Sequence, residues 1–395
     1  MPLDYDLAIV GGGLAGSALA AAMAPSGARV LIAEREAVFR DRVRGEGMLP
    51  WGVAEARQLG IYDRLLERCA HQTRFLTMPD SNRDLVATTP ARAGMLDFHH
   101  PEMQQCLLDL ASESGAHLLR PAEVVDVTPG DPASVTIRSD GSTRHLTSGL
   151  VIGADGRNSR VRAMCNFDVE RDPDWVTVAG TLYRDMRAPD DAVQMVVNPN
   201  EQALSIVFLI GAGRYRAYAA YLAAAHPALS GPRDADRFVD MSLTAGASPN
   251  WFRDAVCVGP LASFNAPDCW APHPYRDGVV LIGDAAAASD PVWGGGLSLT
   301  LRDVRVLRDH LLANTDWHAA ATAYAREHDS YFAALHRTHG LWSRLFFGVG
   351  DDAAVLRERS LPRIGGDPSR MIDFIGLGPE APNDTAAERR FFGED

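Results

Sequence analysis

A glycine-rich turn between a buried strand and a helix constrains this chain more than any other feature. Residues 5–10 (YDLAIV) are apolar and predict a strand, and residues 14–23 are rich in Ala and Leu and predict a helix. Between them, Gly11, Gly13 and Gly16 have the spacing G-x-G-x-x-G. The first glycine permits a tight turn, the second lets a phosphate approach the backbone, and the third lets helix and strand pack closely. The segment therefore predicts a βαβ unit that binds a dinucleotide at the helix N-terminus.

An acidic residue ends the second strand of this predicted unit. Residues 29–33 form another apolar run, and Glu34 follows, 18 residues after Gly16. In dinucleotide-binding folds, an acid near this spacing accepts hydrogen bonds from a ribose. A carboxylate also repels a 2′-phosphate, so we expect an unphosphorylated ribose, as in FAD or NAD. Arg35 fits either a solvated residue or one that stacks on the adenine.

Two further glycine turns follow apolar runs later in the chain. Residues 153–160 (GADGRNSR) come after the run 150–152, and residues 283–286 (GDAA) come after the run 278–282. Pro291 and a triple glycine follow, before a helix that is predicted to begin near Leu297. Each turn alone also fits an ordinary loop, such as an Asx turn that closes a strand. The order of the three turns is the informative feature.

In this order the three segments resemble those of single-component FAD-dependent monooxygenases, the class A flavoproteins with the para-hydroxybenzoate hydroxylase fold. The resemblance covers roughly residues 4 to 345. It implies an α/β fold: a Rossmann-like FAD-binding domain, an antiparallel β-sheet substrate domain and C-terminal helices. It also implies FAD as the cofactor, NADPH or NADH as the electron donor, and O2 and a small molecule as substrates.

The resemblance assigns roles to residues in the later turns. It implies that Asp155 orders the loop beside the pyrophosphate and the nicotinamide donor, and that Asp284 hydrogen-bonds the ribityl chain. The helix after the triple glycine would point its N-terminus at the flavin N1–O2 edge, where it would stabilise the anionic reduced ring. The residues expected to bind FAD are Gly11, Gly13, Leu14, Ala15, Gly16, Glu34, Arg35, Arg44, Gly45, Gln104, Asp155, Gly156, Arg157, Gly283, Asp284, Pro291, Gly294, Gly295, Gly296 and Leu297.

Two positions depart from the pattern that the resemblance implies. Many relatives carry an arginine near the start of a helix in a segment like 98–107, where it reaches the pyrophosphate, and this chain has His100. A histidine is shorter and mostly neutral at pH 7, so we expect this phosphate contact to be weaker or to come from elsewhere. Many relatives also place a histidine where this chain has Ala287.

The substrate pocket is less visible in the sequence than the cofactor site. Arg44 lies in a loop where the family has an arginine that touches the flavin, and Trp293 stands just before the triple glycine. Tyr183 and Tyr218 lie on predicted strands and could point into the pocket or away from it. All four are pocket candidates, and each fits a surface or packing role equally well. No catalytic nucleophile or base is assigned.

The middle of the chain changes to a strand-rich pattern. Strands are predicted over 176–183, 192–197, 203–210 and 215–221, with a hairpin turn at 211–214. This predicts the antiparallel sheet that would roof the substrate pocket. The C-terminal stretch, rich in Pro, Gly and charge, is expected to be a short packed arm with a mobile tail. The predicted ranges are 1–75, 98–170 and 276–349 for the FAD-binding domain with its C-terminal helices, 76–97 and 171–275 for the substrate domain, and 350–395 for the arm and tail.

Composition narrows the function classes. The chain has 395 residues and a formal net charge of -13, which argues against nucleic acid as a partner. No apolar run of membrane-spanning length is seen. The apolar N-terminal stretch is not preceded by the basic residues that a signal peptide carries, so we expect a cytoplasmic protein. Its five cysteines show no C-x-x-C spacing and are expected to be reduced, buried thiols, with no metal site. The oligomeric state cannot be predicted.

Three kinds of activity fit these observations. The first is an NAD(P)H-driven monooxygenase that hydroxylates or epoxidises a small aromatic or polyketide-like substrate through a C4a-hydroperoxyflavin. The second is a flavin-dependent halogenase, although the W-x-W-x-I-P segment of tryptophan-type halogenases is missing. The third is an FAD-dependent reductase of isoprenoid double bonds, because the stretch 291–296 is similar to those enzymes.

Overall fold

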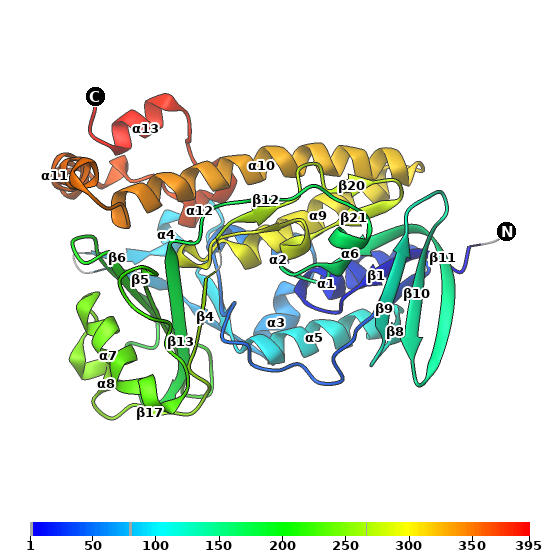
Figure 1. The fold of residues 1–395 in the computed structure, drawn as a ribbon, viewed down its shortest axis with the longest axis horizontal. Coiled ribbons are helices and arrows are strands. Elements are labelled where there is room, and N and C mark those ends of the chain that lie inside the picture. Colours follow the sequence, from blue (N-terminus) through cyan, green and yellow to red (C-terminus); the bar gives the residue numbers. More distant parts are fainter. Residues whose placement is uncertain (1–2, 79–80, 266) are drawn as a thin grey trace.

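The computed structural model describes residues 3–78, 81–265 and 267–395. Residues 1–2, 79–80 and 266 lie outside the described residues. They belong to the predicted ranges 1–75, 76–97 and 171–275. Two large mixed β-sheets occupy opposite ends of the molecule, and helices lie beside and between them (Figure 1). The long helix α10 (Trp317–Phe346) runs along one side, from the first sheet toward the second (Figure 1). Within the described residues, no helix combines the length and apolar character needed to cross a bilayer.

The first sheet contains the predicted βαβ unit. Strand β1 (Tyr5–Val10) pairs in parallel with β2 (Val30–Ala33) and with β11 (Ser142–Gly153). Helix α1 (Leu14–Met23) supplies the crossover that a parallel pair requires. The other strands are β8 (His117–Leu119), β9 (Glu123–Thr128), β10 (Ala133–Ser139), β20 (Tyr275–Arg276) and β21 (Val279–Leu281).

The parallel strands of this sheet end level with one another. Val10 lies opposite Ala33 on one side and opposite Gly153 on the other, and Gly153 in turn lies opposite Leu281. Each strand is followed directly by one of the segments singled out in the sequence. The tertiary structure therefore brings the three glycine turns and Glu34 to the same edge of one sheet, which is where ligands bind in open α/β folds.

The second sheet is mostly antiparallel, as predicted. Its order is β17-β13-β16-β15-β14-β5-β6, and β18 pairs with β13. The predicted hairpin joins β15 to β16, and Gly211 and Gly213 adopt the positive φ angles of +85° and +66° that such a turn needs. The strands are β5 (Phe75–Met78), β6 (Ser81–Asp84), β13 (Val176–Arg184), β14 (Ala192–Asn198), β15 (Ala203–Leu209), β16 (Arg214–Leu222), β17 (Val256–Cys257) and β18 (Ala262–Asn265).

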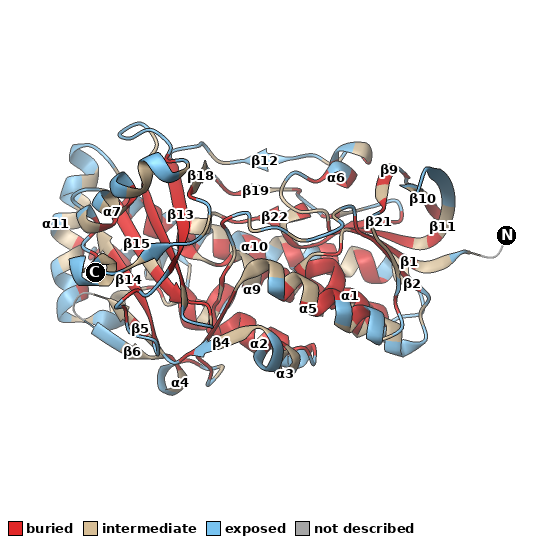
Figure 2. Cartoon of the chain, turned by 90° about the horizontal axis from the view of Figure 1, so that it is seen from below, coloured by how far each residue is buried: buried red, intermediate tan, exposed pale blue. Residues whose placement is uncertain are grey.

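The two faces of the second sheet are buried against different partners. Val207, Ala217 and Tyr221 pack with Phe238 of helix α7 (Ala235–Thr244) on the outer face. Residues at the alternate positions face the body of the molecule. Figure 2 shows that buried residues concentrate in the second sheet and in the helices that lie next to the first sheet. Because strand side chains alternate, the register of each strand decides which residues can reach a ligand.

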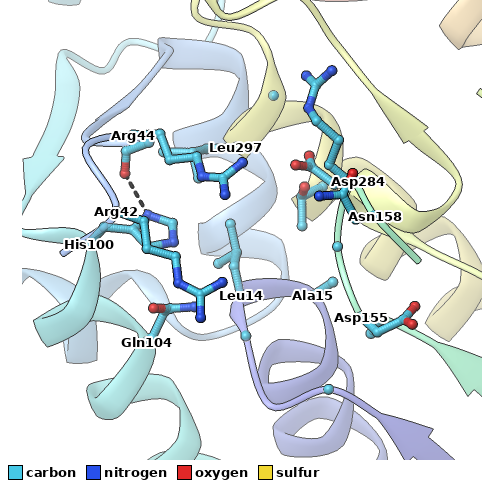
Figure 3. Close-up of a pocket in the computed structure, with 18 of the residues that line it drawn as sticks. Leu14, Ala15, Arg42, Arg44, His100, Gln104, Asp155, Asn158, Asp284 and Leu297 are labelled. Carbon is cyan, nitrogen blue, oxygen red and sulfur yellow. Dashed lines mark hydrogen bonds between the residues drawn. The ribbon is translucent and has the colours of Figure 1, made fainter. Parts of the chain in front are cut away.

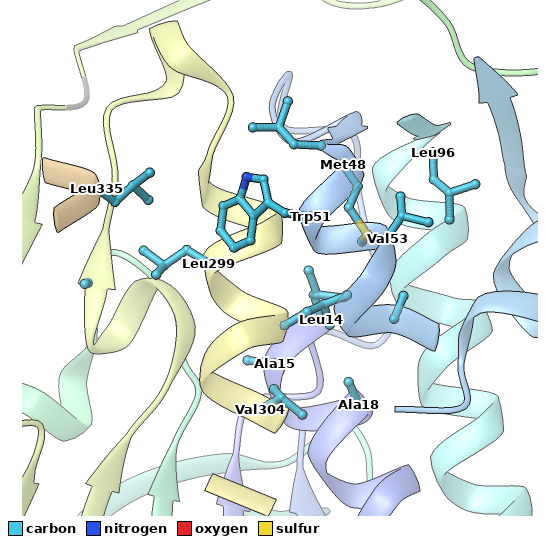
Figure 4. Close-up of a cluster of buried hydrophobic side chains, with 14 of the residues drawn as sticks. Leu14, Ala15, Ala18, Met48, Trp51, Val53, Leu96, Leu299, Val304 and Leu335 are labelled. Carbon is cyan, nitrogen blue, oxygen red and sulfur yellow. The ribbon is translucent and has the colours of Figure 1, made fainter. Parts of the chain in front are cut away.

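The helices between the sheets form a continuous apolar core. Helix α1 packs against α5 (His100–Glu113) and α9 (Gly296–Ala313), and α9 packs against α2 (Pro50–Gln58) and α10. Leu14, Trp51, Leu299 and Val304 are among the buried side chains that meet there (Figure 4). The remaining elements are β3 (Gly47–Met48), β4 (Ala70–Thr73), β7 (Met95–Phe98), β12 (Glu170–Arg171), β19 (Cys269–Trp270), β22 (Ala287–Ala288), α3 (Tyr62–Arg68), α4 (Leu85–Thr88), α6 (Arg160–Met164) and α8 (Pro249–Phe252).

The C-terminal segment is packed, as expected of an arm, but its last part forms a helix where a mobile tail was expected. It forms α11 (Asp351–Gly366), α12 (Phe374–Leu377) and α13 (Thr385–Phe391). Phe391 and Phe392 are buried, and the Phe374 ring meets the Trp342 ring at a centroid distance of 4.9 Å. Each fully buried Phe stabilises the fold by about 1.5–3 kcal/mol. The expectation of a mobile tail rested on the average composition of the segment. A few aromatic residues, which change that average little, anchor the segment to α10.

The expectation that the five cysteines are buried is only partly met. All five cysteines are free, and Cys106 and Cys165 are buried. Cys257, however, is exposed, because it lies on the short edge strand β17. Cys69 and Cys269 are half-buried.

Candidate functional site

A cavity of about 600 Å³ extends from the carboxyl edge of the first sheet to the inner face of the second. Gly11 and Glu34 line one end, and Ile206 and Tyr218 line the other. Figure 3 shows part of the wall, where segments far apart in the sequence meet. The predicted residues that line this cavity are Gly11, Gly13, Leu14, Ala15, Glu34, Arg35, Arg44, Gly45, Gln104, Asp155, Gly156, Arg157, Asp284, Pro291, Gly294, Gly296, Leu297 and Tyr218.

Gly16, Gly283 and Gly295 are absent from the cavity lining and serve packing instead. A Cβ atom on Gly16 would lie 2.0 Å from the Gly11 carbonyl oxygen, so this glycine lets α1 pack closely on the turn. A Cβ on Gly283 would lie 3.1 Å from the Ala15 side chain. A Cβ on Gly295 would lie 3.0 Å from the His339 ring. At these three positions the missing side chain lets neighbouring segments pack closely.

Gly11 and Gly13 perform the roles that the turn demands. Gly11 has a φ of +105°, and a Cβ there would lie 2.5 Å from the Ala154 carbonyl oxygen. The turn after β1 can therefore approach the end of β11. Gly13 faces the cavity, and a Cβ there would meet only Gln104, at 3.5 Å. The space in front of the α1 N-terminus stays open to a ligand.

Two helix N-termini open onto this cavity. Helix α1 begins after Gly13 and α9 begins after Gly295, and neither receives a capping hydrogen bond from a side chain within the described residues. Their first residues, including Leu14 and Leu297, line the cavity. Uncapped amides and the helix dipole make such ends favourable for anions. The α1 end suits a diphosphate, and the α9 end suits a ring that becomes anionic on reduction.

Glu34 is held at the rim by backbone amides. The Gly12 amide donates to its Oε2 at 2.7 Å, and the Glu36 amide donates to its Oε1 at 2.7 Å. The side chain is buried, yet it lines the cavity. Each carboxylate oxygen can accept more than one hydrogen bond. Glu34 is thus fixed in place and still able to accept from ribose hydroxyls.

Asp155 and Arg157 order the second glycine turn. Asp155 accepts hydrogen bonds from the Ser159 hydroxyl at 2.5 Å and from the Arg160 and Val161 amides, which start helix α6. The Arg157 guanidinium donates to the carbonyl oxygens of Pro267 and Ser289, both at 2.7 Å. These contacts tie the second glycine turn to the segment that precedes Pro291.

His100 cannot replace an arginine electrostatically. Its Nδ1–H donates to the Gly45 carbonyl oxygen at 2.8 Å, and burial lowers the pKa of the ring, which is therefore neutral. Arg42 and Arg44 supply positive charge on the same wall (Figure 3). Arg42 was not among the predicted residues, because its loop offers several arginines and no periodic pattern separates them.

The structure contradicts two of the predicted pocket residues. Tyr183 packs on the outer face of the second sheet, 5.8 Å from the Phe252 ring between centroids. Strand alternation allows this orientation as readily as the other, and the sequence offers no way to choose. Trp293 is buried among aromatic residues, and its Nε1–H donates to the Ser343 hydroxyl at 2.8 Å. It lines a separate apolar cavity of about 40 Å³.

Tyr218, in contrast, faces the main cavity and begins a buried polar cluster. Its hydroxyl donates to Glu46 Oε2. Glu46 Oε1 lies 3.0 Å from Arg216 Nε, and Arg216 Nη2 lies 2.6 Å from Asp41 Oδ2. We call Tyr218, Glu46, Arg216 and Asp41, together with His99 3.7 Å from Asp41, the Tyr218 cluster. Sequence reasoning missed it, although an arginine within the apolar run 215–222 was a usable signal.

Burial sets the electrostatics of this cluster. Burial raises the pKa of Glu46, and the Arg216 charge opposes that rise. Burial also raises the pKa of Tyr218 well above its usual range. For Asp41, hydrogen bonds from His99 and Arg216 outweigh burial and hold the pKa far below its ordinary value. Asp41 therefore carries the charge that balances Arg216, and Glu46 is the group of intermediate proton affinity.

The donors and space at this site fit FAD. The uncapped α1 N-terminus, the open face of Gly13 and the oriented Glu34 carboxylate match a diphosphate next to a ribose. Leu297 at the uncapped α9 N-terminus and Asp284 lie on the wall between these groups and the second sheet. The cavity is lined by residues of both sheets, so a single ligand can contact both sheets.

Comparisons with known proteins agree with this geometry. A family model described as "FAD binding domain" matches residues 4–336. Squalene monooxygenase of Mus musculus is 25% identical, and the match covers 85% of this chain and 59% of the mouse protein. The chain thus spans less than two thirds of the length of that relative. Kynurenine 3-monooxygenase of Stenotrophomonas maltophilia is 27% identical, with 82% of this chain and 75% of that protein covered. For 6-methylpretetramide 4-monooxygenase of Streptomyces rimosus, the identity is 26%, with coverages of 75% and 73%.

Solved structures share the fold over nearly the whole chain. The p-nitrophenol 4-monooxygenase PnpA of Pseudomonas putida DLL-E4 has a TM-score of 0.78 at 18% identity, and covers 95% of this chain and 97% of its own. The flavin-dependent halogenase CmlS has a TM-score of 0.76 at 19% identity, with coverages of 98% and 76%. At these identities the likeness concerns the fold alone. The family match shows that the chain belongs to the family described as FAD binding domain, and its fold is that of the solved flavin-dependent enzymes named above.

Proposed function

We propose that this protein is an NAD(P)H-driven monooxygenase that inserts one oxygen atom into a small aromatic or polyketide-like substrate. Bound FAD would supply electron transfer from NAD(P)H and the activation of O2. The observation that carries the proposal is the continuity of the cavity. One space joins the cofactor-binding edge, marked by Glu34, to the inner face of the second sheet, marked by Ile206 and Phe208.

The protein's own residues would position the substrate and keep water out. Leu204, Ile206 and Phe208 from β15 form an apolar wall, and Phe264 from β18 adds to it. An apolar enclosure protects a reactive oxygen donor from hydrolysis and holds a flat substrate against it. Tyr218 is a polar contact on this wall. Asp155 and Arg157 would hold the loop next to the electron donor in its folded shape.

Halogenation and double-bond reduction are less well supported. The sequence lacks the W-x-W-x-I-P segment of tryptophan-type halogenases. The relatives with the names kynurenine 3-monooxygenase and 6-methylpretetramide 4-monooxygenase support oxygen insertion. A reductase would need a flavin site but no dry space for an oxygen donor, and the apolar wall of β15 favours the monooxygenase.

The test is a screen followed by a single turnover. Phenols and polyketides are tested for stimulation of NADH and NADPH oxidation by the purified FAD-loaded protein. The reduced protein is then mixed with the best compound and isotopically labelled O2, and the product is weighed. One labelled oxygen atom in the product supports the proposal. A product that gains two hydrogens without O2, or one that forms only with added halide, would overturn it.

A further inference from the structure

Two of the five cysteines lie side by side where α3 meets α5. Cys69 directly follows α3, and Cys106 lies in the middle of α5. The Cys69 thiol donates to the Leu65 carbonyl oxygen, with 3.6 Å between sulfur and oxygen. The Cys106 thiol donates to the carbonyl oxygen of the preceding residue, Arg64, at 3.7 Å. Both sulfur atoms therefore lie against the same turn of α3.

The two thiols also act on each other. A hydrogen bond between their side chains is the main cause of both pKa shifts, since it raises the pKa of Cys69 and lowers the pKa of Cys106 to about 7. The Cys69 S–H is thus the donor when Cys106 is charged. Cys106 is therefore partly ionised at neutral pH, where a thiol of ordinary pKa is almost entirely protonated.

Arg64 stabilises the charged form of Cys106. After the hydrogen bond from Cys69, the positive charge of Arg64 is the main influence that lowers the pKa of Cys106. The guanidinium is held by Glu113, which accepts from its Nη2 at 2.6 Å. The Arg64 Nε is buried and has no hydrogen-bond partner among the described residues. An acceptor beside it, such as a thiolate or the oxygen of an oxidised sulfur, would remove the cost of this unmet donor.

Other groups around the pair oppose ionisation but do not outweigh Cys69 and Arg64. Burial raises the pKa of Cys106, and the Asp109 charge on α5 raises it further. The Glu102 charge, also on α5, adds to the rise in the pKa of Cys69 that the hydrogen bond causes. The balance leaves Cys106 as the reactive thiol and Cys69 as the protonated one.

We propose that Cys106 and Cys69 form a site of reversible oxidation by hydrogen peroxide, in which Cys106 reacts first and Cys69 closes a disulfide. Because Cys106 is buried and Cys69 is half-buried, only a small oxidant reaches the sulfur atoms. Neither cysteine belongs to the described residues that line the main cavity. The site is therefore separate from the candidate FAD and substrate site, and it does not rest on the proposed function.

The oxidation proceeds in two balanced steps. The Cys106 thiolate attacks one oxygen of the peroxide, so that an S–O bond forms, the O–O bond breaks, and the departing hydroxide takes up a proton to give water. Cys106 is thereby oxidised to a sulfenic acid. The Cys69 sulfur then attacks the Cys106 sulfur, so that the S–S bond forms, the S–O bond breaks, and the hydroxyl leaves as water with the Cys69 proton. The pair of thiols loses two electrons and two protons, and the peroxide is reduced to water.

Charge decides the order of these steps. While Cys106 is ionised, the hydrogen bond to it and its charge keep Cys69 protonated. A sulfenic acid is neutral, so this restraint on Cys69 ends when Cys106 is oxidised. Cys69 can then ionise and attack. Condensation with a neighbouring thiol also protects a sulfenic acid from irreversible oxidation.

The experiment exposes the FAD-loaded protein, without NAD(P)H, to hydrogen peroxide and follows each cysteine by mass spectrometry of its peptides. Cys257 is the internal reference, because it is exposed and its sulfur contacts Thr181. At pH 7, Cys106 should be oxidised at least about tenfold faster than Cys257. The product should be a disulfide between Cys69 and Cys106 that dithiothreitol reverses. The rate at Cys106 should level off above about pH 8, where a thiol of ordinary pKa still gains charge.

Single substitutions separate the two roles. Cys106→Ser should abolish the rapid oxidation, and Cys69→Ser should stop at a sulfenic acid on Cys106, which dimedone traps. Cys165→Ser is the matched control, because Cys165 is also buried but burial raises its pKa to about 11. This variant should form the disulfide at the wild-type rate. Bound FAD and circular dichroism are recorded for every variant, and each exchanges one sulfur for one oxygen, so loss of folding is recognised directly.

Three outcomes would overturn this inference. The first is oxidation of Cys106 no faster than that of Cys257. The second is a wild-type protein in which Cys106 proceeds to a sulfinic acid without a disulfide to Cys69. The third is a Cys69→Ser variant that yields no trapped sulfenic acid while it remains folded. None of these measurements involves oxygen insertion into a substrate, so each leaves the proposed function to its own test.

Discussion

The Glu34 carboxylate accepts a hydrogen bond of 2.7 Å from the Gly12 backbone amide, which joins the end of β2 to the glycine turn after β1. An acid that is oriented by backbone amides holds its position whether or not a ligand is bound. The spacing seen in the sequence is therefore realised as a direct contact at the cavity rim. Substitutions at this contact test the cofactor site.

Glu34→Lys should weaken FAD binding by about a hundredfold, because an acceptor of ribose hydrogen bonds becomes a donor of opposite charge. The dissociation constant is measured by flavin fluorescence quenching on the FAD-free protein. Glu67→Lys, an exposed residue on α3, makes the same charge change away from the cavity and should bind FAD normally. A protein that shows no flavin spectrum and takes up no FAD would refute the cofactor site as a whole.

Asp284→Ala should lower FAD affinity or slow flavin reduction by about tenfold while it leaves the fold intact. Asp284 lines the cavity between β21 and the start of α9, where the resemblance implies a ribityl contact. The measurements are FAD content, the rate of reduction by NAD(P)H and the far-ultraviolet circular dichroism spectrum. Normal values for all three would remove Asp284 from the site.

Gly11→Ala should destabilise the protein by about 2 kcal/mol or more, because the new methyl would clash with the backbone in addition to adopting a strained φ. The Cβ would lie 2.5 Å from the Ala154 carbonyl oxygen. Gly27→Ala is the control, since Gly27 also has a positive φ, +92°, but no atom lies within 4 Å of its would-be Cβ. It should cost about 1 kcal/mol. Urea unfolding of the FAD-free variants gives both values, and equal losses would argue against a close turn.

Asp97 should make stability depend on pH. It is fully buried on β7, the Thr73 hydroxyl donates to its Oδ2, and burial raises its pKa to about 8. The unfolded chain releases this proton near its ordinary pKa of 3.8, whereas the folded protein keeps it. The stabilising contribution is therefore complete below about pH 4 and is lost as the pH rises to about 8, by about 1.4 kcal/mol per pH unit at most.

Asp97→Asn should flatten this dependence. The free energy of unfolding of the variant, minus that of the wild type, should therefore be larger at pH 8 than at pH 5. The measurement is the free energy of unfolding in urea at both pH values. Asp41→Asn should not imitate this effect, because hydrogen bonds from His99 and Arg216 lower the pKa of Asp41 instead. Parallel pH profiles for Asp97→Asn and the wild type would show that Asp97 titrates normally.

The cofactor end of the site could be predicted because its signals are local. Each turn follows its own strand, so the chemistry of Gly11, Glu34 and Asp155 is written within a few residues of each strand end. The parallel arrangement, with Val10 opposite both Ala33 and Gly153, then places the turns together. Short-range patterns were enough to predict the dinucleotide-binding βαβ unit, whereas FAD and the rest of the fold were implied by the resemblance of the three turns in their order.

The substrate end required the tertiary structure. Tyr183 and Tyr218 have the same residue type and lie on neighbouring strands, but the register of β13 against β16 turns them to opposite faces. The contact of Arg216 with Glu46 joins residues 170 positions apart, and nothing near either residue announces it. The sequence by itself determined the cofactor fold, because backbone turns are encoded locally. Only the tertiary structure decided which side chains face the substrate, because that depends on strand register and on long-range packing.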